Sequence, residues 1–190
     1  MGKIYLIRHG QSEDNAAGIL GGRRDSALTE LGIRQAKKAA ETISDRDINL
    51  IYSSPLRRAL TTAEIIADIA GIKELKKDDR LVERDFGILT GRPYSDIYAL
   101  ASGILETDKI KYFLDAPEAE TFPQAYERGK IFIEEIRSRH ANEDILIVAH
   151  GDIGQMIRAA YLGKSWEKGL DMPYPKNTDI CDLSFSDIQI

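Results

Sequence analysis

The stretch Ile4-Tyr5-Leu6-Ile7-Arg8-His9-Gly10 decides the fold class of this chain, because four consecutive apolar residues stop abruptly at two basic residues and a glycine. The stretch Ile145-Leu146-Ile147-Val148-Ala149-His150-Gly151 repeats this arrangement late in the sequence. Short apolar runs that are rich in branched residues are typical of strands buried on both faces of a parallel sheet. We therefore predict two such strands, each followed directly by a histidine and a glycine.

The remaining elements fit between and around these two strands. Leu50-Ile51-Tyr52 predicts a weaker third strand, and residues 179–185 predict a fourth. Apolar residues spaced by three or four positions predict three helices. One begins near Thr29, one runs from Phe122 to Arg139, and one begins after Gly151. Ser54-Pro55 is interpreted as the N-cap and first residue of a helix that runs to about Ala70. Alternating strands and helices predict an α/β three-layer sandwich, with a mostly parallel central sheet and helices on both faces.

The chain has 190 residues, no internal repeat and no linker, so residues 1–190 are predicted to form a single domain. Residues 84–123 are the irregular part. They contain three of the glycines and three of the prolines (Gly87, Gly91, Gly103, Pro93, Pro117 and Pro123). We interpret this segment as a long excursion over one edge of the sheet, which forms a lid or a substrate-specificity segment.

Composition narrows the classes of partner. The formal net charge is -5, which argues against nucleic acid or a membrane surface, although a few clustered arginines can still attract a small anion. The longest apolar run, Ile145–Ala149, is far too short to cross a bilayer. Cys181 is the only cysteine and is interpreted as a packing residue. With no apolar signal region in Met1 to Gly10, we expect a cytoplasmic protein. The sequence leaves its oligomeric state open.

Basic side chains gather at one place in this predicted fold. Ligands of open α/β sheets bind at the carboxyl ends of the strands, where His9 and His150 follow two strands and Arg57-Arg58 follows a third. Taken singly, each is more often a surface residue, but the repeated His-Gly arrangement favours a shared site. Guanidinium groups match the oxygens of a phosphate monoester, and a neutral imidazole can attack phosphorus. Gly10 and Gly151 are expected to let the backbone approach this ligand closely.

Four motifs in order carry a resemblance to a known family. They are Arg8-His9-Gly10 with Gln11-Ser12 and Asn15, Ser53 to Ala63, Leu81 to Gly87, and Val148-Ala149-His150-Gly151. Together they resemble the histidine phosphatase, or phosphoglycerate mutase-like, family, and the similarity runs from residue 3 to about residue 162. The resemblance implies the phosphoglycerate mutase-like fold and a histidine acid phosphatase-like enzyme.

The resemblance also implies roles for individual residues. His9 matches the nucleophile that becomes phosphorylated, and Glu83 matches the acid that protonates the leaving oxygen. The phosphate pocket is then lined by Arg8, Arg58 and His150. Arg58 takes the family position because it directly precedes Ala59, which leaves Arg57 as an exposed neighbour; His140 matches no motif and is expected at the surface.

A second set of residues matches the substrate side of the family's pocket. Asn15 matches a residue that helps hold the phosphate, and Glu120 lies in a stretch resembling a Gly-Glu-Ser segment with Ala119 in place of the glycine. Asp14 stands at a position where many relatives of the family have an aromatic residue, and Ile19 and Gly21 stand where some phosphatases have Arg and Gln. Specificity is therefore expected to differ around Gly21. No acidic cluster with metal-ligand spacing accompanies the motifs, so we expect neither a metal nor another cofactor.

Three functions fit these motifs. The first is a phosphomonoesterase for small phosphorylated metabolites, in which water attacks the phosphohistidine. The second is a phosphoglycerate mutase, in which a bound hydroxyl takes the phosphoryl group back. The mutases that the chain resembles have longer insertions with further arginines, whereas Arg92 and Arg128 are the only arginines here between Arg84 and Arg137. The third, a binding module that has lost catalysis, is disfavoured because the motif residues are intact.

Overall fold

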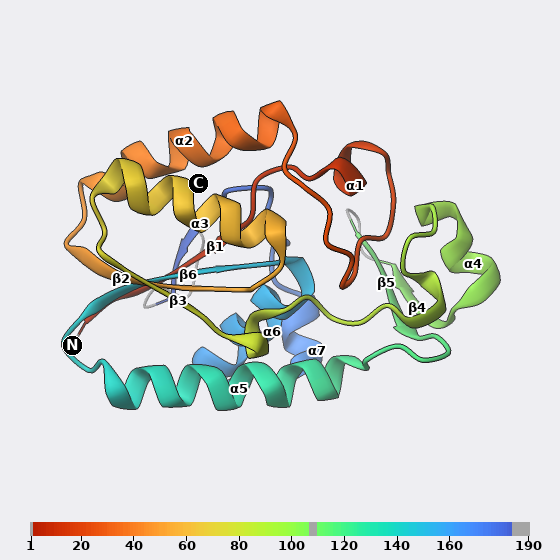
Figure 1. Ribbon diagram of the computed structural model, residues 1–190. Coiled ribbons are helices and arrows are strands. Elements are labelled where there is room, and N and C mark those ends of the chain that lie inside the picture. The colour runs from red at the N-terminus through yellow and green to blue at the C-terminus, as the bar shows by residue number, and fades with distance from the viewer. Residues whose placement is uncertain (1, 107–109, 184–190) are drawn as a thin grey trace.

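A five-stranded sheet forms the centre of the computed structural model, which describes residues 2–106 and 110–183 (Figure 1). The strand order is β3-β2-β6-β1-β7. The strands β1 (Ile4–Arg8), β2 (Ile48–Ser53), β3 (Glu74–Lys77) and β6 (Asp144–Ala149) are parallel, and β7 (Ile180–Asp182) pairs antiparallel with β1. This confirms the mostly parallel sheet, with the two predicted histidine-bearing strands side by side at its centre.

Helices cover both faces of the sheet (Figure 1). The helices α2 (Glu30–Ser44) and α3 (Arg57–Ala70) lie on one face, and α5 (Phe122–Arg139), α6 (Gly151–Tyr161) and the short α7 (Trp166–Leu170) lie on the other. Adjacent strand residues point to opposite faces. Ile7 therefore belongs to the core beneath α2 and α3, whereas Leu6 packs with α5 and α6. The predicted three-layer α/β sandwich is confirmed.

Element boundaries differ from the sequence prediction in three places. The helix α3 begins at Arg57 and has no side-chain cap, because the Ser54 hydroxyl faces His150 and accepts from Leu56 N instead. The strand β3 was not predicted, since it is an exposed edge strand with the sequence Glu-Leu-Lys-Lys and no apolar run. The predicted strand 179–185 is shorter, spanning Ile180–Asp182, and residues 184 and 185 lie outside the described residues.

The segment 84–123 is more regular than its glycines and prolines indicated. It contains two single-turn helices, η2 (Gly87–Leu89) and η3 (Tyr94–Asp96), then α4 (Ile97–Leu100) and an antiparallel pair, β4 (Ser102–Glu106) and β5 (Lys111–Asp115). These elements have a small core of their own, made of Leu20, Phe86, Leu89, Ile97, Phe113 and Ala116. Glycine- and proline-rich turns between very short elements hid this order, because no element is long enough to show a period.

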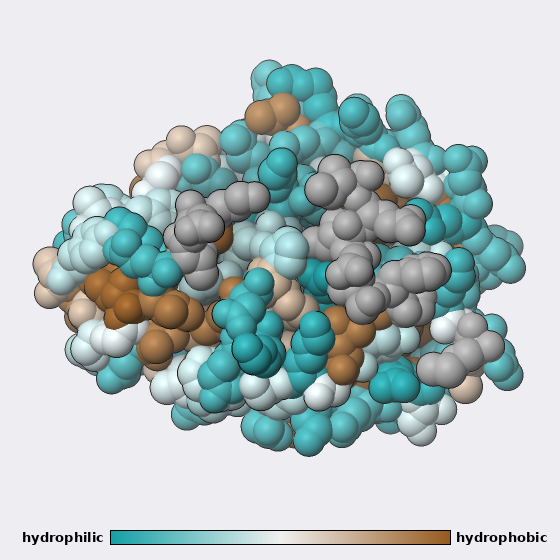
Figure 2. All heavy atoms as spheres, turned by 180° about the vertical axis from the view of Figure 1, so that it is seen from behind, coloured by the Kyte–Doolittle hydropathy of each residue, from teal (hydrophilic) through white to brown (hydrophobic). Residues whose placement is uncertain are grey.

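Two further segments complete the architecture. The helix α1 (Glu13–Ala16) follows the first motif and is capped by Ser12, and η1 (Asp79–Leu81) precedes Glu83. Figure 2 shows hydrophobic residues gathering on the rear face at the end that carries α4, β4 and β5. Within residues 2–106 and 110–183, no helix has both the length and the apolar character needed to cross a membrane.

Candidate active site

The two motif histidines meet at the carboxyl ends of β1 and β6. These strands are parallel neighbours in which Arg8 pairs with Ala149, so the residues that follow them emerge together. The ring centroids of His9 and His150 are 5.0 Å apart with an interplanar angle of 61°, and both side chains are almost fully buried. The sheet register therefore produces the juxtaposition that the repeated His-Gly pattern predicted.

Hydrogen bonds fix the protonation pattern of His9. Its Nδ1 lies 2.6 Å from the carbonyl oxygen of Gly10, which can only accept, so Nδ1 carries the proton and donates. Arg58 Nε donates to His9 Nε2 over 3.1 Å. Burial, reinforced by the positive charges of Arg58 and Arg8, holds the pKa of His9 well below its usual range. His9 is therefore a neutral imidazole with its lone pair on Nε2, the form that a nucleophile needs.

Arg58 is turned into the site by the first turn of α3. Its Nη1 and Nη2 donate to the carbonyl oxygens of Arg24 and Gly22, so the loop before α2 wraps around the guanidinium. Thr62, one turn further along α3, donates to the Arg58 carbonyl and accepts from Gly10 N. Arg57 points outward and is exposed. The structure thus places Arg58 rather than Arg57 against the histidines.

Arg8 and His150 are the two remaining side chains that the sequence assigned to the phosphate pocket. Arg8 Nη1 donates to the Pro175 carbonyl, and its guanidinium lies 5.2 Å from the centre of the Tyr174 ring. His150 Nε2 lies 2.8 Å from Ser54 Oγ, while its buried Nδ1 has no hydrogen-bond partner among the described residues. Burial and the charge of Arg58 lower the pKa of His150 well below its usual range. A buried nitrogen without a protein partner is suited to meet a ligand oxygen.

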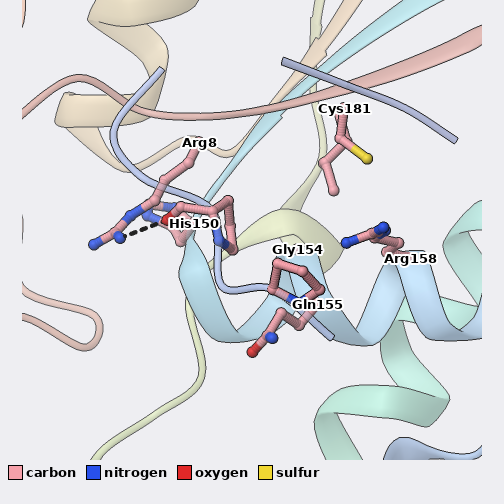
Figure 3. Close-up of a pocket in the computed structure, with 9 residues that line it drawn as sticks. Arg8, His150, Gly154, Gln155, Arg158 and Cys181 are labelled. Carbon is pink, nitrogen blue, oxygen red and sulfur yellow. Dashed lines mark hydrogen bonds between the residues drawn. The ribbon is translucent and has the colours of Figure 1, made fainter. Parts of the chain in front are cut away.

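A narrow cavity lies behind these two side chains. Figure 3 shows Arg8 and His150 on one side of it and Arg158 and Cys181 on the other. Its volume is about 20 Å³, room for roughly one water molecule and too little for a phosphate monoester. This cavity therefore does not hold the phosphate of a substrate.

Glu83 follows η1, and its carboxyl lies at the N-terminus of α6, where four backbone N–H groups hold it. Its Oε2 accepts from Gly151 N (2.9 Å) and Asp152 N (3.3 Å), and its Oε1 accepts from Ile153 N (3.1 Å) and from Arg84 N (2.9 Å). Burial and the nearby negative charge of Asp152 raise the pKa of Glu83, against the opposing effect of the N–H donors. Glu83 is thus a buried carboxyl biased toward its protonated form.

Two of the substrate-side residues expected from the sequence, Asn15 and Gly21, lie against other protein side chains. Asn15 Oδ1 accepts from Ser12 N as part of a helix cap and from Asn177 Nδ2, whose amide also donates to the His9 carbonyl. Asn15 therefore lies beside His9 but is engaged by the protein. Gly21 lines the buried carboxylate of Asp14, which pairs with Arg24 over 3.2 Å.

Glu120 is tied into an ion-pair network away from the histidines. Its carboxylate binds Arg128 at 2.7 Å and Arg23 at 3.2 Å, and it also accepts from Asp85 N. The positive charge and hydrogen bonds of Arg128 hold the pKa of Glu120 below its usual range, despite partial burial. This geometry fits a structural role, joining α5 to the segment after Glu83.

The structure gives a different physical reason for glycine at positions 10 and 151 from the close approach of a ligand that the sequence indicated. A Cβ on Gly10 would lie 2.4 Å from the Gly32 carbonyl oxygen, and one on Gly151 would lie 1.8 Å from the Tyr174 hydroxyl. Protein atoms, not only a ligand, therefore require glycine at these positions. The packing brings α2 and residues 173–178 close to the strand ends.

Several residues that hold the site residues in place were not predicted from the sequence. Ser54, Thr62 and Asn177 orient the histidines and Arg58, and Arg84, Asp152 and Tyr174 surround Glu83. Ser54, Thr62 and Arg84 stand within the quoted motifs and so carried a signal, whereas Asn177 and Tyr174 come from a loop with no motif. His140, at the end of α5, is partly buried and contacts Tyr52 and Glu143, away from the site. Among residues 2–106 and 110–183, no group of three His, Cys, Asp or Glu side chains is arranged to hold a metal.

Comparisons with known proteins place this geometry in context. The sequence-family model of the histidine phosphatase superfamily (branch 1) matches residues 4–189 of this chain. Phosphoserine phosphatase 1 of Hydrogenobacter thermophilus is 33% identical over 180 residues, covering 90% of this chain and 83% of the relative. The Entamoeba histolytica phosphoserine phosphatase, solved with 3-phosphoglyceric acid, has a TM-score of 0.79 at 28% identity and covers 95% of this chain and 89% of its own. A mycobacterial glucosyl-3-phosphoglycerate phosphatase solved with VO3 has a TM-score of 0.81 at 25% identity, over 95% and 90%.

Proposed function

The chain belongs to the histidine phosphatase superfamily, branch 1, and from that premise we propose that it hydrolyses small phosphorylated metabolites through a phosphohistidine on His9. The observation that carries the proposal is the arrangement of His9: a neutral ring whose Nε2 keeps its lone pair while Arg58, Arg8 and His150 surround it. A phosphate group bound there would meet a nucleophile and three cationic or hydrogen-bonding side chains at once.

The first half-reaction follows from this arrangement. His9 Nε2 attacks phosphorus, the N–P bond forms, and the bond from phosphorus to the ester oxygen breaks. Arg58 and Arg8 stabilise the charge on the phosphoryl oxygens, and His150 Nδ1 offers a further contact. Glu83 gives its proton to the departing oxygen, which leaves as a neutral alcohol. The approach of a phosphate dianion favours the protonated form of Glu83, in the same direction as burial.

The second half-reaction returns the enzyme to its starting state. The Glu83 carboxylate accepts a proton from a water molecule as the oxygen of that water attacks phosphorus. The N–P bond breaks, and inorganic phosphate is released. His9 becomes neutral again and Glu83 is protonated, so one water is consumed for each ester cleaved. This is general acid catalysis followed by general base catalysis at the same carboxyl.

A phosphoglycerate mutase using the same phosphohistidine is the second candidate. It would require side chains that hold the carboxylate of the acceptor, and the arginines of the segment after Arg84 are poorly suited. Arg128 is occupied by Glu120 and by the carbonyl oxygens of Arg80 and Val82, and Arg92 is exposed. This favours transfer to water over transfer to a held hydroxyl. A binding module without catalysis is the third candidate, and the intact His9, Arg58, Glu83 and His150 count against it.

A panel of phosphorylated metabolites tests the proposal. It should include O-phosphoserine and 3-phosphoglycerate, the ligands named for the relatives, together with a nitrophenyl phosphate. Phosphate release and conversion of 3-phosphoglycerate to its 2-isomer are measured in the same samples, with and without EDTA. We expect phosphate release that survives EDTA, because Arg8 and Arg58 supply the positive charge that balances the ester. Isomerisation without phosphate release would favour the mutase, and turnover of no phosphate ester at all would refute both.

A further inference from the structure

Arg84 and Asp152 form an ion pair directly against the carboxyl group of Glu83. Arg84 Nε lies 2.9 Å from Asp152 Oδ2, and both side chains are almost fully buried. The backbone N–H groups of the same two residues donate to Glu83, Arg84 N to Oε1 and Asp152 N to Oε2. Each member of the pair therefore touches Glu83 through its main chain and its partner through its side chain, which closes a ring around the carboxyl.

The Arg84 guanidinium has no freedom to leave this ring. Its Nη1 donates to the Glu120 carbonyl and its Nη2 to the Phe113 carbonyl, so all its nitrogens have partners. The carbon of the guanidinium lies 4.0 to 5.1 Å from the ring centres of Phe113, Phe122 and Phe86. One side chain thus joins the start of α6, the strand β5 and the segment that carries Glu83.

Asp152 is held equally firmly on the α6 side. Its second oxygen, Oδ1, accepts from the Tyr174 hydroxyl over 3.2 Å, and Tyr174 also packs against Gly151. With a guanidinium on one oxygen and a phenol on the other, this buried carboxylate is fixed in place. Its negative charge therefore acts on Glu83 from a constant position.

We propose that Arg84 and Asp152 are positioning residues for Glu83, which hold this carboxyl at the start of α6 and set its charge for proton donation. The inference rests on the proposed function for its catalytic meaning, but the contacts themselves do not depend on the substrate.

Other charged and titratable groups also face Glu83 and are the same in every variant below. They are Arg58 from α3, Arg23 from the preceding loop, Arg128 from α5, Tyr94 from η3, Tyr174, and His150 beside Gly151. Asp152 is the nearby charge that raises the pKa of Glu83, in addition to burial. Removing that charge and removing the Arg84 charge should consequently move the titration of Glu83 in opposite directions.

The test is a direct titration of Glu83 in the full-length protein, followed by carboxyl ¹³C NMR and assigned with Glu83→Gln. Asp152→Asn keeps the shape and the Arg84 contact but removes the anion, so the acid dissociation constant of Glu83 should rise about tenfold. Arg84→Met removes the cation, so the constant should fall. Asp78→Asn and Arg80→Lys, which alter another ion pair on η1, serve as matched controls.

Turnover gives the second readout. Asp152→Asn should leave Glu83 less protonated, and Arg84→Met should leave its carboxyl less firmly placed, because the contacts of the Arg84 side chain are lost. In both variants kcat/KM for an alkyl phosphate should fall about tenfold more than kcat/KM for a nitrophenyl phosphate, because only the alkyl leaving group needs the proton. The ratio of two substrates in one preparation cancels any loss of folded protein. Unchanged or same-direction titrations, with equal losses on both substrates, would overturn the proposal and leave a purely structural ion pair. If wild type cleaved neither ester, the proposed function would fail, and the titration alone would still decide this inference.

Discussion

The nucleophile side and the acid side of the proposed site are both buried, yet burial acts on them in opposite directions. His9 lies among Arg58 and Arg8, and its pKa is lowered; Glu83 lies beside Asp152, and its pKa is raised. Low polarity disfavours whichever form is charged. Burial in one place therefore favours a neutral imidazole at His9 and shifts Glu83 toward the protonated form that a general acid needs.

The two sides also differ in how they are held. The His9 ring has one backbone partner, at Nδ1, and one side-chain partner, Arg58, at Nε2. Glu83 has four backbone donors and a surrounding ion pair. Groups whose environments drive their pKa values apart are the acid and base assignments of an enzyme. Besides burial, neighbouring cations shift the pKa of the proposed nucleophile, whereas a neighbouring anion shifts that of the proposed acid.

Deleting the proposed nucleophile should have the largest effect on turnover. His9→Ala should lose turnover by a factor on the order of 10⁶, the scale expected when a covalent nucleophile is deleted. The protein should still fold, because His9 follows β1 and faces the polar pocket rather than the sheet core. Mass spectrometry after acid-free quenching should find phosphate on His9 of the wild type. Phosphate on a serine, or full activity of His9→Ala, would contradict the mechanism.

Removing the acid comes next in size. Glu83→Gln should slow an alkyl phosphate by about 10²–10⁴-fold, because that leaving group needs a proton, and should slow a nitrophenyl phosphate much less. Both oxygens of Glu83 accept N–H donors, so the glutamine NH₂ will face donors and destabilise the site as well. Only the ratio of kcat/KM values for the two substrates isolates proton donation.

Two neighbouring acids are the controls for that experiment. Asp79 is exposed, and Asp85 pairs with Arg23 and accepts from Gly87 N. Asp79→Asn and Asp85→Asn remove a charge without touching the α6 N-terminus. A substrate-selective loss in Asp85→Asn, or an equal loss on both substrates in Glu83→Gln, would place the acid on another residue.

Replacing Arg58, the arginine beside His9, should reduce kcat by a smaller factor. Arg58→Lys keeps the charge but loses the planar fork that meets His9 and the carbonyl oxygens of Gly22 and Arg24. We expect kcat to fall about 10²–10³-fold for alkyl and nitrophenyl phosphates alike, the scale of one lost transition-state donor. Arg57→Lys, one residue away and exposed, is the matched control and should leave kcat unchanged. A loss in Arg57→Lys as large as that in Arg58→Lys would show that the wrong arginine has been assigned.

These two sides also differ in how far the sequence predicted them. The strands β1 and β6 are unbroken apolar runs, so their carboxyl ends, and with them His9 and His150, followed from the pattern alone. Glu83 stood among charged neighbours and was picked out only by resemblance to a family motif. Asn177 and Tyr174 contact the site from a loop after α7, and no period or motif marks them. Contacts that depend on where a loop folds back are set by tertiary packing, which local patterns do not encode.

The smallest expected effect is on the free energy of unfolding, whose pH dependence should reflect the burial of His9 and His150. A histidine whose pKa is lowered on folding binds fewer protons in the folded state than in the unfolded state. Both His9 and His150 are of this kind, so the free energy of unfolding should fall as the pH drops below about 6.5. Between pH 7.5 and 5.5 each such histidine contributes about 1.4 kcal/mol of this loss. His150→Gln should flatten the decline by that amount in urea titrations, and His140→Gln, which removes a histidine outside the site, is the comparison. An unchanged slope in His150→Gln would mean that burial does not set the charge of this ring, and the common origin proposed for the neutral base and the neutral acid would be lost.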